Sequence, residues 1–150
     1  MALMEDLNAC LVALGGILTA GSSPLAGYDI MFAEMPTQPE KSDYPWVDIL
    51  ALDQEFYHDV TDSMDIRTLV VLRLYSKAQG SATTSSLLAS QEELNDCREW
   101  VIDTVMDNAH NNGIWISLKV QRASRLYLEK DRRSASVADI ECILHYRRRP

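Results

Sequence analysis

The sequence of 150 residues predicts an α+β fold, in which a mixed and mainly antiparallel sheet is flanked by two helices. Two observations lead to this class. Several stretches alternate apolar and polar residues with the period of two that marks a half-buried strand, and two others repeat apolar residues at the spacing of a helix face. One domain covering residues 1–150 is expected, because a chain of this length can bury a core without disulfides or metals.

The central strand is predicted at residues 66–75, which read IRTLVVLRLY. Its even positions from Ile66 to Leu74 fall on one face of an extended chain, and Leu69 and Val71 lie on the other face between arginines. A strand of this kind is expected inside a sheet rather than at its edge. Cover of its second face by a helix would be ordinary packing, whereas exposure would mark a surface for another subunit.

The N-terminal part is expected to form a helix and two strands. Apolar residues recur at helical spacing until Gly21 and Pro24 stop the pattern. Strands are expected at 28–34 and 46–52, separated by a segment with three prolines, 36–45. The acidic residues 53–65 have a spacing similar to that of a calcium loop, but they lack the Gly and the terminal Glu of that motif, so no metal is expected there.

The second helix is predicted at residues 91–110, and a polar segment precedes it. Ser90 and Glu93 have the spacing of a capping box. One face of the helix is lined by Leu94, Cys97, Val101, Val105 and Ala109. Residues 77–90 read KAQGSATTSSLLAS and are interpreted either as a flexible linker or as a loop that pairs with a neighbouring protein.

Strands are expected to close the chain. Residues 114–121 alternate, which places Ile116 inward and Trp115 outward. An irregular segment at 122–125, a short extended piece at 126–129 and a basic turn at 130–133 follow. The last strand turns its even positions from Ala138 to Tyr146 inward, and the arginines 147–149 form a basic tail.

The charge of the chain argues against a protein that grips nucleic acid, because its formal net charge is −8. Residues 1–75 hold 3 Lys/Arg against 12 Asp/Glu, net −9, and residues 76–150 hold 11 against 10, net +1. This asymmetry gives one protomer two differently charged faces, or it lets unlike patches of neighbouring protomers meet in a ring or filament.

The sequence lacks the motifs of common catalytic sites. It has no glycine-rich phosphate loop, GxSxG, HExxH or CxxC, so no enzyme activity, cofactor or metal is expected. The odd number of cysteines indicates buried thiols at Cys10, Cys97 and Cys142. The three histidines, His58, His110 and His145, are isolated from one another, which favours surface or capping roles.

The start of the chain predicts neither a membrane span nor a signal peptide. The apolar run at residues 9–20 is too short to cross a bilayer. Glu5 and Asp6 stand where a signal peptide carries positive charge. A protein made in the cytoplasm, without membrane contact, is therefore expected.

The order of elements resembles that of tailed-bacteriophage tail terminators, which cap a finished tail tube and join it to the head. The resemblance covers nearly the whole chain and rests on LMEDLNACLVAL, PWVDIL, IRTLVVLRLY with its polar loop, ELNDCREWVIDTV and ADIECILHYRRR. It implies a hexameric ring in the virion at the tail–head junction, with the tail tube protein and a head–tail connector or stopper protein as partners. It brings no catalytic residues, and DNA would slide through the channel without specific binding.

Candidate interface residues come from the polar loop, an outward aromatic residue, and the basic turn and tail. They are Gln79, Ser81, Thr83, Thr84, Ser85, Trp115, Arg122, Arg125, Arg132, Arg133, Arg147 and Arg148. A head–tail connector or stopper, a tail-tube-related structural protein and a monomeric binding adaptor are alternatives, because they would share the same elements. A small enzyme would need a cleft with convergent groups that the sequence does not name.

Overall fold

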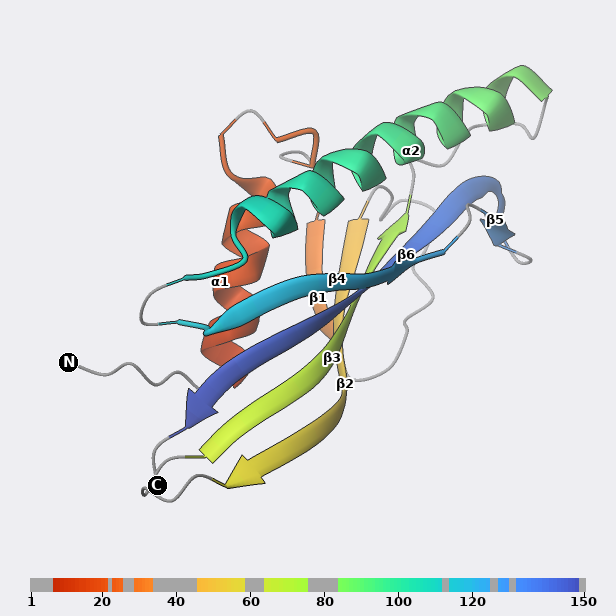
Figure 1. Cartoon of the computed structure of the whole chain (residues 1–150). Coiled ribbons are helices and arrows are strands. Elements are labelled where there is room, and N and C mark those ends of the chain that lie inside the picture. Colours follow the sequence, from red (N-terminus) through yellow and green to blue (C-terminus); the bar gives the residue numbers. More distant parts are fainter. Residues whose placement is uncertain are drawn as a thin grey trace.

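The computed structural model describes residues 7–21, 23–25, 29–33, 46–58, 64–75, 84–111, 114–124, 127–129 and 132–148, and it leaves aside the side chains of 29–33, 46, 58, 84–91, 127–136 and 148. These residues form two helices and a mixed sheet, which confirms the predicted α+β class (Figure 1). In chain order the elements are α1 (Leu7–Thr19), β1 (Asp29–Ala33), β2 (Trp46–His58), β3 (Met64–Tyr75), α2 (Thr84–Asp107), β4 (Ser117–Ala123), β5 (Tyr127–Glu129) and β6 (Arg132–Arg148).

The sheet has the strand order β1-β2-β3-β6-β4, and β5 pairs with β6 beside this path. β1 runs parallel to β2, and every other pairing is antiparallel. β3 lies between β2 and β6, so the prediction of a central strand at 66–75 is confirmed. Its even positions from Ile66 to Leu74 are all buried, as the alternation predicted.

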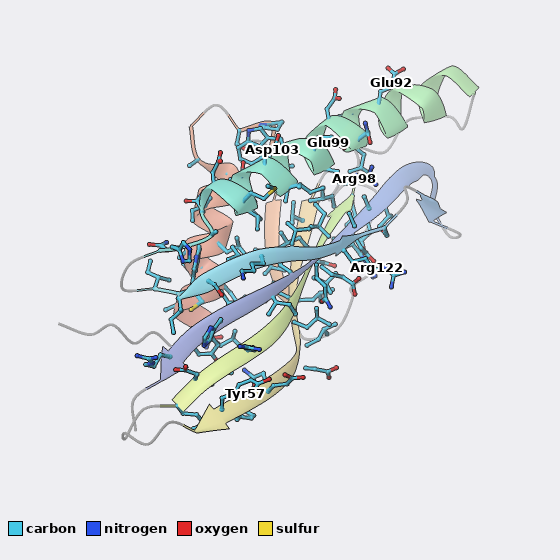
Figure 2. All side chains as sticks on the ribbon, in the orientation of Figure 1. Tyr57, Glu92, Arg98, Glu99, Asp103 and Arg122 are labelled. Atoms are coloured by element: carbon cyan, nitrogen blue, oxygen red, sulfur yellow. The ribbon has the colours of Figure 1, made fainter. Side chains whose placement is uncertain are left out.

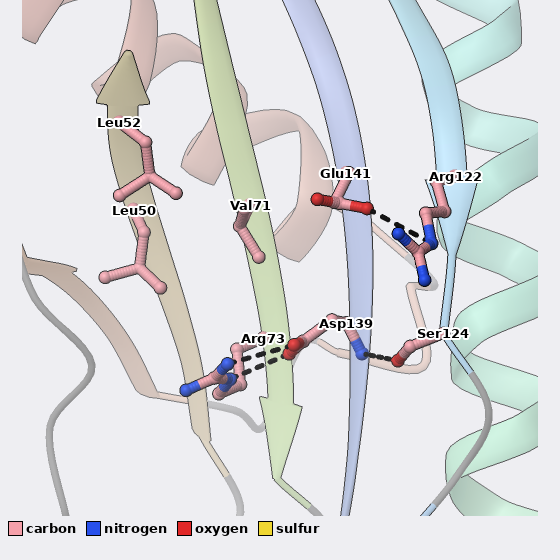
Figure 3. Close-up of a pocket in the computed structure, with 8 residues that line it drawn as sticks. All are labelled: Leu50, Leu52, Val71, Arg73, Arg122, Ser124, Asp139 and Glu141. Carbon is pink, nitrogen blue, oxygen red and sulfur yellow. Dashed lines mark hydrogen bonds and ion pairs between the residues drawn. The ribbon is translucent and has the colours of Figure 1, made fainter.

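Both helices pack on one face of this sheet. A single core cluster joins Leu14 and Leu18 of α1, Val101 of α2, Val70 of β3 and Cys142 of β6. In the close-up of the opposite face, the two helices lie behind the strands (Figure 3). Neither helix therefore covers the second face of β3. Within the described residues, neither helix combines the length and the apolar character that a membrane span needs.

The predicted stop of α1 is confirmed. Gly21 has φ of 60°, a left-handed conformation in which glycine is unstrained. The hydroxyl of Ser23 donates to the carbonyl of Leu18 and accepts the Leu25 N–H at 3.0 Å. This buried hydroxyl satisfies backbone groups that the helix end would otherwise leave without partners.

The strand predicted at 46–52 is longer than expected, because β2 continues to His58. The pairing with β3 shifts between Ala51 and Gln54, which is a β-bulge. A bulge adds one residue to a strand and interrupts the alternation of its side chains. That interruption made the strand seem to end at residue 52.

The prediction of a polar loop through residue 90 is also wrong, because α2 begins at Thr84 and not after the capping box at Ser90. The helix ends at Asp107, before the Asn and Gly that were expected to close it. The predicted inner face is confirmed for Leu94, Cys97, Val101 and Val105, which are all buried. Ala and Leu residues within 84–90 favour a helix and offset the serines there.

The orientation predicted for residues 115 and 116 is reversed. Trp115 is 3% exposed and its indole N–H donates to the Asn108 carbonyl at 3.0 Å, whereas Ile116 is 37% exposed. Trp115 belongs to an isolated bridge with Asn111, so β4 begins only at Ser117. The alternation read from the sequence had been extended backward across a turn.

The end of the chain is more regular than predicted. β4 includes Arg122 and Ala123, which were expected to be irregular, and β6 already begins at Arg132 inside the expected basic turn. β6 also contains Arg148, which was expected to lie in a tail, and Arg147, which was expected to face outward from the last strand as well as to begin the tail. The even positions of β6 from Ala138 to Tyr146 are buried, which confirms their predicted direction. The proline-rich segment 36–45 lies outside the described residues.

Candidate interaction surface

The candidate site is the face of the sheet opposite the helices, which we call the helix-free face. It consists of the side chains that β2, β3, β6 and β4 turn away from the core. One hollow of about 370 Å³ lies over its upper part and a second of about 310 Å³ over its lower part. The first is lined by Leu50, Leu52, Val71, Arg73, Arg122, Ser124, Asp139 and Glu141 (Figure 3), and the second by Asp53, Glu55, Arg67, Leu69, Gln121 and Ile143.

Apolar side chains form the middle of this face. Leu50 and Val71 face each other across β2 and β3, and Leu69 faces Ile143 across β3 and β6. Leu52 lies 42% exposed beside them. Because of the bulge in β2, the successive residues Leu52 and Asp53 both lie on the helix-free face, where Leu52 lines the upper hollow and Asp53 the lower one. Leu50 and Val71 are themselves 2% and 6% exposed, so the open apolar area of this face comes from Leu52 and from the half-buried Leu69 and Ile143. Open apolar area between charged rows is typical of a surface that meets another protein.

An ion pair with two hydrogen bonds closes one end of the face. Arg73 Nε lies 2.7 Å from Asp139 Oδ1, and Nη2 lies 2.9 Å from Oδ2 (Figure 3). The Asp139 N–H donates to Ser124 Oγ at 2.9 Å, and the Ser124 N–H donates to the Asp139 carbonyl at 2.8 Å. Asp48 stands opposite Arg73 in the β2–β3 register and is fully buried. These contacts fix the positions of the side chains that line the upper hollow.

A second polar group lies at the other end of the face. Arg147 Nε is 2.7 Å from Asp65 Oδ1, and His145 Nε2 is 3.4 Å from Asp65 Oδ2. The hydrogen bond from Arg147 is the main reason why the pKa of Asp65 is lowered. Nearby, the Tyr57 hydroxyl donates to Glu55 at 2.6 Å, and that bond raises the pKa of Tyr57.

A second set of exposed acidic side chains lies away from this face, on the outer side of α2. Glu92, Glu99 and Asp103 lie along this helix (Figure 2), and Glu93, Asp96 and Asp107 are exposed on it too. Its one basic residue, Arg98, donates to the Ser124 carbonyl at 2.6 Å. The net charge of +1 for residues 76–150 is therefore a sum of two unlike parts, an acidic helix and strands rich in arginine that follow it.

The structure brings few of the predicted interface residues together. Arg122 lines the upper hollow, and Arg147 lies at the opposite end of the same face. Trp115 is buried in the core, whereas it was expected to face outward. For five others the structure describes only the backbone: Thr84, Ser85, Arg132, Arg133 and Arg148. The remaining four lie outside the described residues: Gln79, Ser81, Thr83 and Arg125.

Sequence reasoning missed exposed residues of β2, of which Leu52 and Tyr57 lie on the helix-free face, whereas Phe56 pairs with the core residue Ile66 and lies on the other face. Leu52, Phe56 and Tyr57 are exposed large apolar residues on one strand. Residues 54–57 do alternate between the two faces of the sheet, and the two aromatic residues favour a strand. The alternation over residues 54–57 is therefore the signal in the sequence that β2 continues past the bulge, with the acidic Glu55 on an exposed face.

The chemistry of the described residues gives a docking surface more support than a reaction centre. Burial raises the pKa of the Cys142 thiol to about 12, so it stays protonated at neutral pH and is a poor nucleophile. All three cysteines are buried thiols, as predicted. His110 Nδ1 lies 2.7 Å from the Ile116 carbonyl, and the Ile116 N–H donates to the backbone carbonyl of His145 at 2.7 Å. The described part of the chain holds no group of three or more His, Cys, Asp or Glu side chains placed to share a metal ion.

Comparison with known proteins adds no family to this description. No protein-family model matches the chain, and no curated protein is significantly similar to it in sequence.

Proposed function

We propose that this protein is a structural virion protein that caps the tail tube of a tailed bacteriophage as a ring. In this role it stops polymerisation of the tube and forms the joining surface for the head connector. The helix-free face is the observation that carries the proposal. A sheet with helices on one side only keeps its other side for water or for another protein, and here that side has an apolar middle in which Leu52 is exposed and Leu69 and Ile143 are half-buried.

The arrangement of this face suits rigid docking. Its charged groups are held in cross-strand contacts such as Arg73–Asp139 and Arg147–Asp65, so little ordering is needed when a partner arrives. A capping protein whose surface is already ordered loses little freedom when it binds the end of a finished tube. A preformed sheet face with shallow hollows is a surface of this kind.

The charge distribution suits the passage of DNA. The exposed carboxylates of α2 repel phosphate groups, so a ring that turns this helix toward its channel would let DNA slide without binding. On the helix-free face, by contrast, acidic and basic side chains alternate. We assign that face to protein contact for this reason.

A structural role accounts for the described polar groups better than catalysis does. Catalytic acids and bases converge on one point in a cleft. Here the polar side chains spread in rows along the strands, and His145 and Asp65 lie at one end of the sheet while Arg73 and Asp139 lie at the other.

Disruption of the gene in its phage tests the proposal. Without the protein, tails should exceed their normal length and heads should stay unjoined, because nothing stops the tube or receives the connector. Supplying the intact protein from a plasmid should restore both, and electron microscopy of the lysate measures them. Virions with normal tails and joined heads in the absence of the protein would refute the proposal.

A further inference from the structure

The sheet has two open edges with different compositions. β1 pairs only with Trp46–Leu50 of β2, so residues 51–58 of β2 extend beyond it and have β3 as their one neighbour among the described strands. At the opposite edge, β4 pairs with β6 alone among the described strands. An edge strand is where a second chain most readily approaches a sheet.

Exposed apolar side chains are concentrated at these edges. Leu52, Phe56 and Tyr57 of the free part of β2 are 42%, 54% and 43% exposed. Ile116, directly before β4, is 37% exposed. Four of the six exposed large hydrophobic residues in the described part of the chain therefore lie at the two edges, and such clusters mark contact sites.

The two edges carry opposite charge. β2 contains the exposed acids Asp53 and Glu55 and no Lys or Arg. β4 contains the exposed bases Lys119 and Arg122 and no Asp or Glu. The Arg122 side chain is 76% exposed, and its Nε is 3.7 Å from Glu141, a loose contact that leaves it able to turn toward a partner.

We infer that the β2 edge of one copy docks against the β4 edge of the next copy, so that copies associate head to tail. This inference rests on the proposed function, because it names the contact that would build the ring. Unlike surfaces on opposite edges of one molecule give a heterologous contact, and such contacts close into rings when the rotation between copies allows it. The pairing of acid with base would also fix the order of the edges.

Side chains, rather than a long backbone ladder, carry this contact. Both edges are interrupted by bulges, between Ala51 and Gln54 in β2 and between Val120 and Arg122 in β4. The outward N–H of Leu118 already donates to the Ala109 carbonyl at 2.8 Å. These features prevent continuous strand addition, so the apolar and charged side chains are the groups to change in a test.

Charge reversal with restoration is the first test. Glu55→Lys and Lys119→Glu should each weaken self-association about tenfold or more, and the double variant should recover most of the loss. Glu99→Lys on α2 is the matched control, because it reverses an exposed acid away from both edges. Sedimentation equilibrium of the full chain over a wide concentration range measures the association, and circular dichroism checks that each variant folds.

Carbodiimide coupling of the unmodified protein is the second test, since it joins a carboxylate to an amine only when they touch. The expected product links Lys119 to Asp53 or Glu55. A mixture of isotopically light and heavy protein should give mixed-isotope linked peptides, because β3 and β6 separate β2 from β4 within one copy by three strand spacings, about 14 Å.

Two results would overturn the inference. The first is a protein that stays monomeric at every concentration. The second is an oligomer that keeps its mass in the Glu55→Lys and Lys119→Glu variants and whose mixed-isotope cross-links do not include Lys119. The second result would leave the proposed function intact, since copies would then meet by other surfaces. Normal virions without the protein would remove the phage role whatever the links show.

Discussion

Arg73 and Asp139 are joined across β3 and β6 by two hydrogen bonds of 2.7 and 2.9 Å. Both side chains are 20% exposed, so water screens the pair only in part. Pairs of this geometry are stronger than single contacts, because the planar guanidinium matches both carboxylate oxygens. This pair therefore stabilises the end of the helix-free face at which the upper hollow lies.

Asp139→Ala is expected to lower the free energy of unfolding by about 2 kcal/mol, because it leaves the largely covered Arg73 guanidinium without this partner. Urea unfolding at neutral pH measures the change. Glu141→Ala is the matched control on the next outward position of β6. It should cost about 0.5 kcal/mol or less, since Arg122 is loosely placed and exposed. Equal losses in the two variants would contradict the importance given to the Arg73 pair.

Asp65 makes the stability of the fold depend on acid pH. The pKa of Asp65 is lowered in the folded state, chiefly by the hydrogen bond from Arg147. A lowered carboxyl pKa stabilises the fold above the unfolded value of 3.8, and this contribution is lost as pH falls through the folded pKa. Wild type should thus be more stable than Asp65→Asn at pH 7, and the difference should shrink toward pH 3. Urea unfolding at pH 7, 5 and 3 checks it, and a difference that does not change with pH would count against this ion pair.

Trp115 gives a test of the reversed orientation before β4. Trp115→Phe keeps most of the buried ring but removes the donor to the Asn108 carbonyl, so it should cost about 1 kcal/mol. Trp115→Ala should cost about 3–5 kcal/mol, because it empties a buried aromatic site. Thermal and urea unfolding measure both changes. A neutral Trp115→Ala variant would mean that the side chain is exposed, as the alternation alone had suggested.

The sequence predicted those parts of the fold in which one periodic pattern runs uninterrupted. The buried positions of β3 and β6 follow from strict alternation, and the inner face of α2 follows from helical spacing at Leu94, Cys97 and Val101. In these elements local pattern and tertiary burial agree. A reader of the sequence alone could therefore place the core.

The pattern failed where a bulge or a turn shifts its phase. The extra residue at positions 52 and 53 of β2 turns two successive side chains toward the same face, which no period of two predicts. The turn before β4 reverses Trp115 and Ile116 in the same way. The helix-free face depends on pairing between strands distant in sequence, so its residues could not be grouped before the register was known.

Phe56 links the fold to the inferred contact between copies. It is 54% exposed, although its partner across the β2–β3 register, Ile66, is 1% exposed. Phe56→Ala should therefore change the free energy of unfolding by about 0.5 kcal/mol or less, whereas Ile66→Ala should cost about 2–5 kcal/mol. Urea unfolding at low protein concentration measures both values.

The same Phe56→Ala variant should weaken self-association in sedimentation equilibrium, because it removes apolar area from the β2 edge without disturbing the core. Val12→Ala is the matched control, since Val12 is 62% exposed on α1, an element that belongs to neither sheet edge. If both variants associate as tightly as wild type, the exposed apolar residues of β2 do not take part in the contact. Weakening by Phe56→Ala alone would separate a binding role for this edge from a general effect of surface hydrophobicity.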